Sequence, residues 1–375
     1  MTTIILDGNY IFHKTFGIFS GFGKKDPGDV LSTEGETNMF VRKVITDLTY
    51  ALNQIPDINR VIFCKDSRSW RKDFEISRSV YKENRTKSEG VDWGSFFRVM
   101  DEFGKYLEDR GYIYSTQNGA EGDDLLWIWA NRIIEEGDNV IAISGDKDLH
   151  QIVKVSGDNW IGVWNNNSKN NKLVVPVGWS PEKKATPSIF DVDPISGSGD
   201  GKLKKLLSSC EVIEIDVKEL VFKKILTGDK KDDVPGVYPH TLKTGRNSNI
   251  AEGKANKIWD LYLETEWKDL SMDQLWENEE FLEWIAGVSL RLLKQTDNQE
   301  NREKFKQYYF ENGTLVWLSE KTIPGDLIES VDSKIGPSLK EQKTPVTNKK
   351  DLLESSPWGG TGNAPKEFDP FKLFE

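Results

Sequence analysis

Short apolar runs alternate with longer amphipathic segments through the first half of the chain. The short runs are rich in β-branched residues, which is typical of strands buried on both faces of a parallel sheet. The longer segments repeat apolar positions every three or four residues and therefore predict helices. Strands are predicted at residues 3–6, 60–65, 112–115 and 139–144, and helices at 37–54, 92–110 and 121–136. This alternation predicts an α/β fold, with a central and mostly parallel sheet flanked by helices.

The second half of the chain follows a different pattern. Residues 165–172 and 193–202 are rich in turn-forming residues and predict surface loops. Helical periodicity resumes at residue 216 and continues to about residue 311, whereas residues 332–364 are rich in Pro, Gly, Ser and Lys and predict a tether. We therefore divide the chain into an α/β domain at 1–215, a helical domain at 216–331 and a flexible tail at 332–375.

Composition narrows the class of protein. The chain has 375 residues, a formal net charge of -11 and two cysteines, Cys64 and Cys210. Cys64 lies inside a predicted strand, so we expect a buried free thiol and a reducing compartment. No apolar stretch is long enough to span a bilayer and no signal peptide is recognisable, so we expect a soluble, cytoplasmic protein. No Cys/His cluster has zinc spacing and no Walker-type phosphate loop occurs, which argues against both kinds of site.

Carboxylates follow three of the predicted strands directly. Asp7, Asp66 and Asp146 each stand at or just beyond the carboxyl end of an apolar run. Open α/β sheets bind their ligands at this edge, so we expect the three side chains to lie close together. Several acids at one edge repel one another unless cations neutralise them. The pattern therefore predicts a metal-ion site.

Two further acidic clusters stand at predicted helix starts or strand ends. Glu121 and Asp123 open a helix together with Asp124, and Asp148 follows Asp146 by two residues. An extended backbone at 146–148 would turn both of these aspartates to the same side. Capping of helix N-termini explains acids at such positions equally well, so each cluster taken alone leaves both interpretations open.

A last acidic cluster lies in the sequence LTGDKKDDVPG. Asp229 and Asp232 are three residues apart and share one face of a helical turn, whereas Asp233 is expected to point outward. Taken alone, this segment could also be a solvated charged turn. Oxygen ligands without His or Cys suit magnesium or manganese. Two such ions, about 4 Å apart, clamp the attacking and leaving oxygens of a phosphodiester displacement.

A basic segment follows Asp66. Aromatic side chains are interleaved with its cations, and such a mixture suits phosphates and the stacked bases of a single strand. A net negative charge does not oppose this, because net charge hides the distribution of charge along the chain. An ordinary amphipathic helix with a solvated face is the alternative. The basic residues of this segment are Arg68, Arg71, Lys72, Arg78, Lys82, Arg85 and Lys87, and the aromatic ones are Trp70, Phe74 and Tyr81.

Taken together and in order, these motifs resemble the structure-specific 5′-nuclease family, the group of flap endonucleases and 5′→3′ exonucleases. The resemblance covers residues 3–330, with gaps at 165–209, and is strongest to the ribonucleases H of T-even bacteriophages. The order of the acidic motifs is specific, whereas any one of them is weak. The motifs are IILDGN, VIFCKDS, WRKDF, YKENR, AEGDDLL, ISGDKDL and LTGDKKDDVPGV.

The resemblance implies a PIN-like core that binds two Mg²⁺ ions, with Mn²⁺ as a substitute. It also implies removal of RNA primers and 5′ flaps during phage DNA replication, in the cytoplasm of the host cell. The ligands that it implies for the first ion are Asp7, Asp66, Glu121 and Asp123, with Asp146 nearby. Those that it implies for the second ion, partly through water, are Asp148, Asp229 and Asp232.

The resemblance also implies how DNA and RNA–DNA hybrids with a 5′ single strand or flap are bound. The basic segment, at about residues 67–90, would be a helical arch around the single strand, in which Lys82 and Arg85 steady the scissile phosphate. A helix-turn-helix-like motif in the helical domain would grip the duplex. The other residues implied in nucleic-acid binding are Arg68, Arg71, Lys72, Arg78, Tyr81, Lys87, Lys230, Lys231, Lys243 and Arg246.

The polar tail ends in the hydrophobic sequence FDPFKLFE. Such an ending is similar to short motifs that dock replication proteins onto a sliding clamp or a single-strand-binding protein, by folding on binding. Packing of the tail on its own domain is the alternative. The docking residues would be Phe368, Phe371, Leu373 and Phe374.

Two other functions compete with a 5′-nuclease. A junction-binding replication scaffold without catalysis would have no need of so many carboxylates. A PIN-type RNA endonuclease would lack both the basic segment and the helical region around Asp229. We therefore expect a magnesium-dependent phosphodiester hydrolase that acts on 5′ ends.

Overall fold

The structure is a computed structural model of the chain. It describes residues 1–21, 30–74, 76–77, 79–84, 90–167, 171–179, 206, 209–238, 240–241, 247–340, 344–354 and 356–358.

Eight strands of the described chain form one sheet in the order β3-β2-β1-β4-β6-β7-β8, with β5 paired to β6. β1 lies between β2 and β4 and runs parallel to both, and β3 and β6 continue the parallel arrangement. Only the pairs of β6 with β5 and β7 are antiparallel among these strands. The prediction of a mostly parallel sheet is confirmed. The strands are β1 (Thr2–Asp7), β2 (Ile58–Cys64), β3 (Ile113–Ser115), β4 (Asn139–Ile143), β5 (Lys154–Ser156), β6 (Asn159–Asn165), β7 (Lys172–Pro176) and β8 (Glu211–Ile215).

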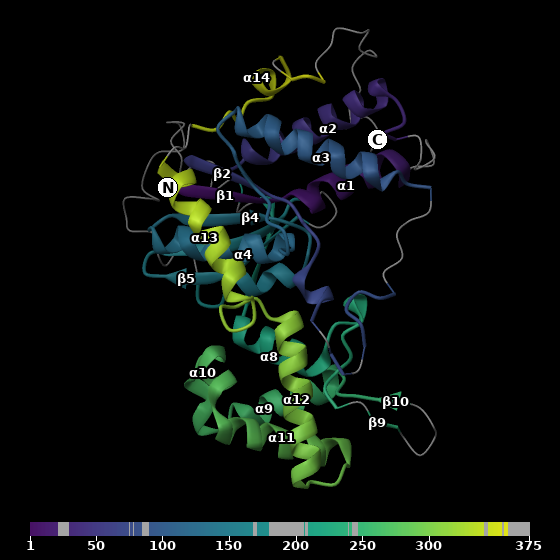
Figure 1. Cartoon of the computed structure of the whole chain (residues 1–375). Coiled ribbons are helices and arrows are strands. Elements are labelled where there is room, and N and C mark those ends of the chain that lie inside the picture. The colour runs from purple at the N-terminus through teal and green to yellow at the C-terminus, as the bar shows by residue number, and fades with distance from the viewer. Residues whose placement is uncertain are drawn as a thin grey trace.

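Helices cover both faces of this sheet (Figure 1). Side chains alternate along a strand, so Ile4 and Leu6 of β1 pack into one core and Ile5 packs into the other. The free thiol of Cys64 is buried, as expected. One face carries α1 (Gly8–Gly21), α2 (Glu34–Leu52) and α3 (Trp93–Glu108), and the other carries α4 (Gly122–Glu135) and α13 (Gly325–Lys340).

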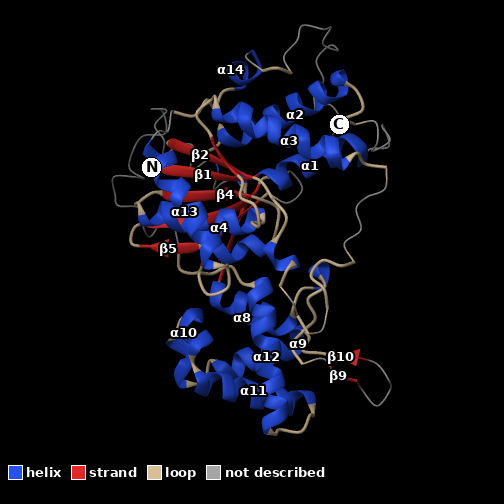
Figure 2. Cartoon of the chain, in the orientation of Figure 1, coloured by secondary structure: helices blue, strands red, loops and turns tan. Residues whose placement is uncertain are grey.

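A second, helical region lies beyond the sheet and has its own core (Figure 2). Aromatic rings fill this core, with Phe222 between Trp259 and Tyr262. A short hairpin of β9 (His240–Thr241) and β10 (Asn247–Ser248) stands between α8 and α9. The prediction of a helical carboxyl-terminal region is confirmed. Its helices are α8 (Val217–Thr227), α9 (Glu252–Tyr262), α10 (Met272–Glu277), α11 (Glu279–Leu293) and α12 (Gln299–Val316).

The predicted tether is folded over its described part. Residues 332–340 belong to α13, which packs on α4, and α14 (Lys349–Glu354) packs on α2. The hydroxyl of Tyr112 donates to the carbonyl of Val346 at 2.9 Å, and Trp358 packs on Tyr106. The prediction was wrong here because a few apolar side chains in a polar stretch are enough to fix it on the core. The four residues predicted to dock a partner lie outside the described residues.

The predicted helical arch also differs from the structure. Of residues 67–90, those described contain the short 3-10 turn η2 (Trp70–Lys72) and no α-helix. Backbone hydrogen bonds tie Ser67 to Ala120 and Trp70 to Gly119, so this part of the chain follows the neighbouring loop instead of coiling on itself. Arg78, Arg85 and Lys87 lie outside the described residues. Among the residues described, no helix has the length and apolar character needed to cross a membrane.

Candidate metal centre

Two strand ends position the first carboxylates. The chain crosses one face of the sheet between β1 and β2 and the other face between β3 and β4, so the switch in direction lies at β1, where α/β sheets bind ligands. Asp7 ends β1 and accepts hydrogen bonds from the Ser144 hydroxyl at 2.6 Å and the Tyr10 N–H at 2.9 Å. Asp66 accepts from the Gly122 N–H. A Cβ at residue 122 would lie 2.6 Å from Asp66 Oδ1, so glycine lets this carboxylate approach the first turn of α4.

Burial and mutual repulsion both act on these carboxylates. Burial raises the pKa of Asp7 to about 7. The hydrogen bonds from Ser144 and Tyr10 lower this pKa, whereas repulsion from Asp66 and Asp146 raises it further. The pKa of Asp123 is raised well above its ordinary value, first by burial and then by four acids. Those four acids are Asp146, Asp7, Asp66 and Glu121. The structure thus brings together the four carboxylates predicted for a first ion and places Asp146 near them.

Helix capping accounts for part of the acidic pattern. Asp124 accepts from the N–H of Glu121 at 3.0 Å, and Asp146 accepts from the N–H of Asp148 at 3.0 Å. The expected extended backbone at 146–148 is wrong, because Lys147 has helical dihedrals and leads into the 3-10 helix η3 (Asp148–Ile152). This turn directs Asp148 away from the strand end and toward a second cluster.

The second cluster is formed by Asp148, Asp229 and Asp232, each of which offers a carboxylate oxygen within 4.8 Å of the others. Asp229 directly precedes the 3-10 turn η4 (Lys230–Asp232), and Asp232 is its last residue. Gly228 stands just before Asp229. Gly228 has φ +69°, and a Cβ there would lie 2.3 Å from the Val234 carbonyl, so the turn requires glycine. Three carboxylate oxygens at this spacing suit a hard divalent cation.

Two lysines bridge these carboxylates. Lys82 forms an ion pair with Glu121 and lies 3.6 Å from Asp232, whereas Lys224 pairs with Asp148 and lies 3.2 Å from Asp229. Burial opposes the charge of Lys224, but Asp148 and then Asp229 raise the pKa of its ammonium. The sequence does not single out Lys224, because it is one of several lysines on α8; its position five residues before Asp229 is the only signal.

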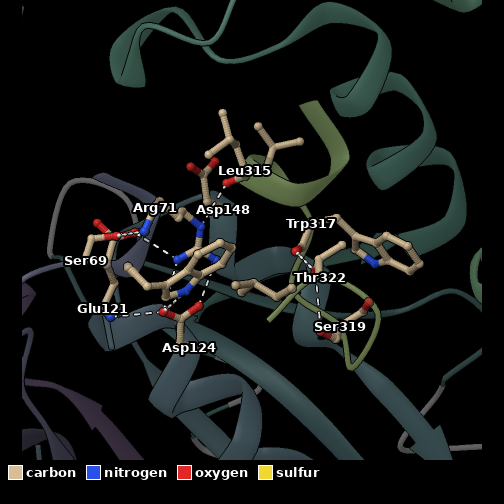
Figure 3. Close-up of polar contacts among 12 residues, drawn as sticks. Ser69, Arg71, Glu121, Asp124, Asp148, Leu315, Trp317, Ser319 and Thr322 are labelled. Carbon is tan, nitrogen blue, oxygen red and sulfur yellow. Dashed lines mark hydrogen bonds and ion pairs between the residues drawn. The ribbon is translucent and has the colours of Figure 1, made fainter. Parts of the chain in front are cut away.

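Arg71 does not lie where it was predicted to bind phosphate. Its side chain is 2% exposed, and its guanidinium donates to both oxygens of Asp124 at 2.8 and 3.0 Å, to Glu121 at 3.1 Å and to the Leu315 carbonyl at 3.1 Å. Figure 3 shows it enclosed between Asp124 and Leu315. The prediction was wrong because buried acids, and not solvent, surround this charge. Arg71 instead fixes Glu121, one of the candidate ligands.

Tyr81 is likewise unavailable to stack on bases. It is 5% exposed, and its hydroxyl donates to Glu121 at 3.0 Å and to Asp232 at 3.2 Å. It therefore joins a carboxylate of the first cluster to one of the second. A small cavity runs between the two clusters. The residues that line it include Arg71, Tyr81, Glu121, Asp123, Asp148, Asp229 and Asp232.

The remaining predicted nucleic-acid contacts lie outside this interior. Arg68, Lys72, Lys230 and Lys231 are exposed, and Arg68 pairs with Asp73. Their exposure leaves them accessible to solvent, as the prediction of phosphate contacts requires. Lys243 and Arg246 are outside the described residues, as are Arg78, Arg85 and Lys87.

The fold and the paired carboxylate clusters define an α/β protein with an acidic site at its sheet edge and a helical extension. Residues 2–176 match the family model of the 5′-3′ exonuclease, N-terminal resolvase-like domain. A 5′-3′ exonuclease of Buchnera aphidicola is 24% identical over 241 residues, which are 64% of this chain and 67% of that protein. Residues 2–176 of this chain are thus similar to the N-terminal domain of 5′-3′ exonucleases.

Solved structures from bacteriophage T5 share the fold. The D15 protein co-crystallised with metal ions matches with a TM-score of 0.51 and 15% identity, over 90% of this chain and 99% of that one. The D15 flap endonuclease in a pseudo-enzyme-product complex with DNA and metal ions matches with a TM-score of 0.50 and 15% identity, over 91% and 100%. The match includes the helical region as well as the sheet.

Proposed function

We propose that this protein is a divalent-metal-dependent 5′-nuclease. It hydrolyses phosphodiesters at the 5′ ends of DNA and RNA–DNA duplexes, and removes RNA primers and flaps in phage DNA replication, as the likeness to the T-even ribonucleases H implies. The observation that carries the proposal is the convergence of Asp148, Asp229 and Asp232 within 4.8 Å, beside a separate cluster of carboxylates around Asp123. Carboxylates from distant segments would not be gathered for capping alone.

Two Mg²⁺ ions, or Mn²⁺ in their place, would be held by the two clusters. The first would use Asp7, Asp66, Glu121 and Asp123, and the second Asp148, Asp229 and Asp232. Such ions, when bound, supply charge neutralisation at the phosphodiester and activation of water. The protein supplies orientation: Tyr81 holds one carboxylate of each cluster, and Arg71 fixes Glu121 from behind.

Substrate binding follows from the cations at the rim. Arg68, Lys72, Lys230 and Lys231 are exposed and would neutralise phosphates, together with the predicted contacts at Arg78, Arg85 and Lys87. Lys82 already lies between the clusters and would move from its carboxylates to the scissile phosphate. The terminal hydrophobic motif would dock a sliding clamp or a single-strand-binding protein. Deleting residues 368–375 should abolish retention on the partner and leave cleavage unchanged; retained binding would refute the docking role.

The direct test uses a 5′-labelled flap and a primer hybrid with Mg²⁺ or with EDTA. We expect cleavage in Mg²⁺ and none in EDTA. The variant Asp146→Asn should lose cleavage while it still folds and binds the substrate. Asp158→Asn, an exposed aspartate in the β5–β6 turn, is the matched control. Cleavage in EDTA would contradict the metal mechanism, and no cleavage under either condition would favour a junction-binding scaffold.

A further inference from the structure

The segment of residues 79–84 is bound to the loop of residues 229–234, about 150 positions away in the sequence. The hydroxyl of Ser79 donates to the Asp233 carbonyl at 2.6 Å, and the N–H of Lys82 donates to the Asp232 carbonyl at 2.9 Å. Asn84 adds two bonds to Asp233, from its N–H to Oδ2 and from its side-chain amide to Oδ1, both at 2.8 Å. Four hydrogen bonds thus join the basic segment to the loop of the second carboxylate cluster.

Both sides of this contact contain a residue in an unfavourable backbone conformation. Lys82 has φ +55° and Asp233 has φ +60°, in the left-handed region that favours glycine. A non-glycine residue stays there only when its surroundings fix it, and such residues concentrate at functional sites. The Asn84–Asp233 pair provides such contacts to both segments.

The contact determines where two side chains of the site lie. The ring of Tyr81 packs into the core of the helical region, and its hydroxyl reaches Glu121 and Asp232. The ammonium of Lys82 lies between the same two carboxylates. In the described hydrogen bonds, neither Asn84 nor Asp233 contacts the side chain of Glu121 or Asp232, so their influence on the site passes through the adjoining backbone of Tyr81, Lys82 and Asp232.

We propose that Asn84 and Asp233 form a latch that positions Tyr81 and Lys82 between the two carboxylate clusters. The latch couples the basic segment to the η4 loop, so Lys82 and Asp232 are brought into register by one pair of side chains. Asn84 and Asp233 are therefore positioning residues and not catalytic ones. The catalytic consequence rests on the proposed nuclease function, whereas the geometric consequence does not.

A swap of the two side chains tests the latch. Asn84→Asp places two carboxylates face to face and removes the amide donor, which should open the contact. The double variant Asn84→Asp/Asp233→Asn restores complementarity, because the introduced amide can donate to the introduced carboxylate and still accept from the N–H of residue 84. Asn53→Asp, at an exposed position after α2, gives the same charge change elsewhere and serves as the control.

Two readouts separate the latch from the nuclease function. Single-turnover cleavage of a 5′ flap with Mg²⁺ should fall roughly 10- to 100-fold in Asn84→Asp, the order expected from a displacement of about 1 Å, while DNA affinity in EDTA stays about unchanged. Trypsin cleavage after Lys82, carried out in EDTA and followed by mass spectrometry, should become faster in Asn84→Asp. Both changes should be reversed in the double variant and absent in Asn53→Asp.

The outcomes decide between the possibilities. Unchanged trypsin cleavage after Lys82 in Asn84→Asp would overturn the latch, as would a double variant that is folded but not restored. Faster trypsin cleavage that the swap reverses, with no nuclease activity in any variant including the natural sequence, would uphold the latch geometry and refute the proposed function. Faster trypsin cleavage with a wild-type rate of flap cleavage would overturn the positioning role.

Discussion

Asp7→Asn should stabilise the metal-free protein at neutral and alkaline pH. Asp7 is 8% exposed, and burial together with repulsion from Asp66 and Asp146 raises its pKa from 3.8 to about 7. Asparagine has nearly the same shape: its amide oxygen can accept from the Tyr10 N–H, and its NH2 group can donate to the Ser144 hydroxyl oxygen, which reverses that hydrogen bond. It removes the charge that is costly in the absence of a cation.

The sign and size follow from proton linkage. The folded state holds the Asp7 proton up to about pH 7, whereas the unfolded chain releases it near pH 3.8, so the natural protein loses stability as pH rises between these values. The full shift of the pKa corresponds to about 4 kcal/mol, and relaxation of the neighbouring acids reduces this to roughly 2–4 kcal/mol. The variant should therefore gain that amount at about pH 8 and almost nothing at about pH 4.

Urea unfolding in EDTA, followed by tryptophan fluorescence, measures the difference across this pH range. Asp158→Asn is the control, because an exposed turn aspartate should change stability by less than about 0.5 kcal/mol. In saturating Mn²⁺ the natural protein should be more stable than Asp7→Asn, since the carboxylate of residue 7 binds the ion better than an amide does. A difference of equal size at both ends of the pH range, or a less stable variant in EDTA at about pH 8, would refute the reasoning.

Two other substitutions test the cations of the site. Lys224→Met should bind Mn²⁺ about tenfold more tightly in titration calorimetry, because an ammonium no longer competes with the ion for Asp148. Lys223→Met is the control: it loses only an i,i+4 ion pair with Glu219 on the same helix and should bind Mn²⁺ as the natural protein does. Weaker Mn²⁺ binding by Lys224→Met would argue against competition. Arg71→Met should cost about 3–5 kcal/mol of stability, because it leaves buried carboxylates unpaired. Lys72→Met should change stability by less than about 0.5 kcal/mol, but it should weaken DNA binding and reduce the salt dependence of that binding. Weaker DNA binding in Arg71→Met with unchanged stability would instead make Arg71 a phosphate contact.

The main elements of the sheet domain could be predicted from the sequence because they depend on local patterns. The run that ends at Asp7 is β-branched from Thr2 to Ile5 and apolar from Ile4 to Leu6, which is typical of a strand covered on both faces. Strand β8, in contrast, is largely exposed and lacks a strong apolar pattern, so the sequence did not indicate it. The same holds for α14, where one buried leucine, Leu352, fixes the helix on the core.

The sequence by itself determined that carboxylates would gather at one edge of the sheet, because the carboxyl ends of parallel strands meet there. Only the tertiary structure decided what each charge does. Arg71 and Lys72 are neighbours of the same sign, yet one is enclosed by Asp124 and the other is exposed to solvent. The placement of Lys224 between two aspartates is equally invisible in its own helix. The energy of a charge depends on burial and on partners that are distant in the chain, so local patterns cannot fix it.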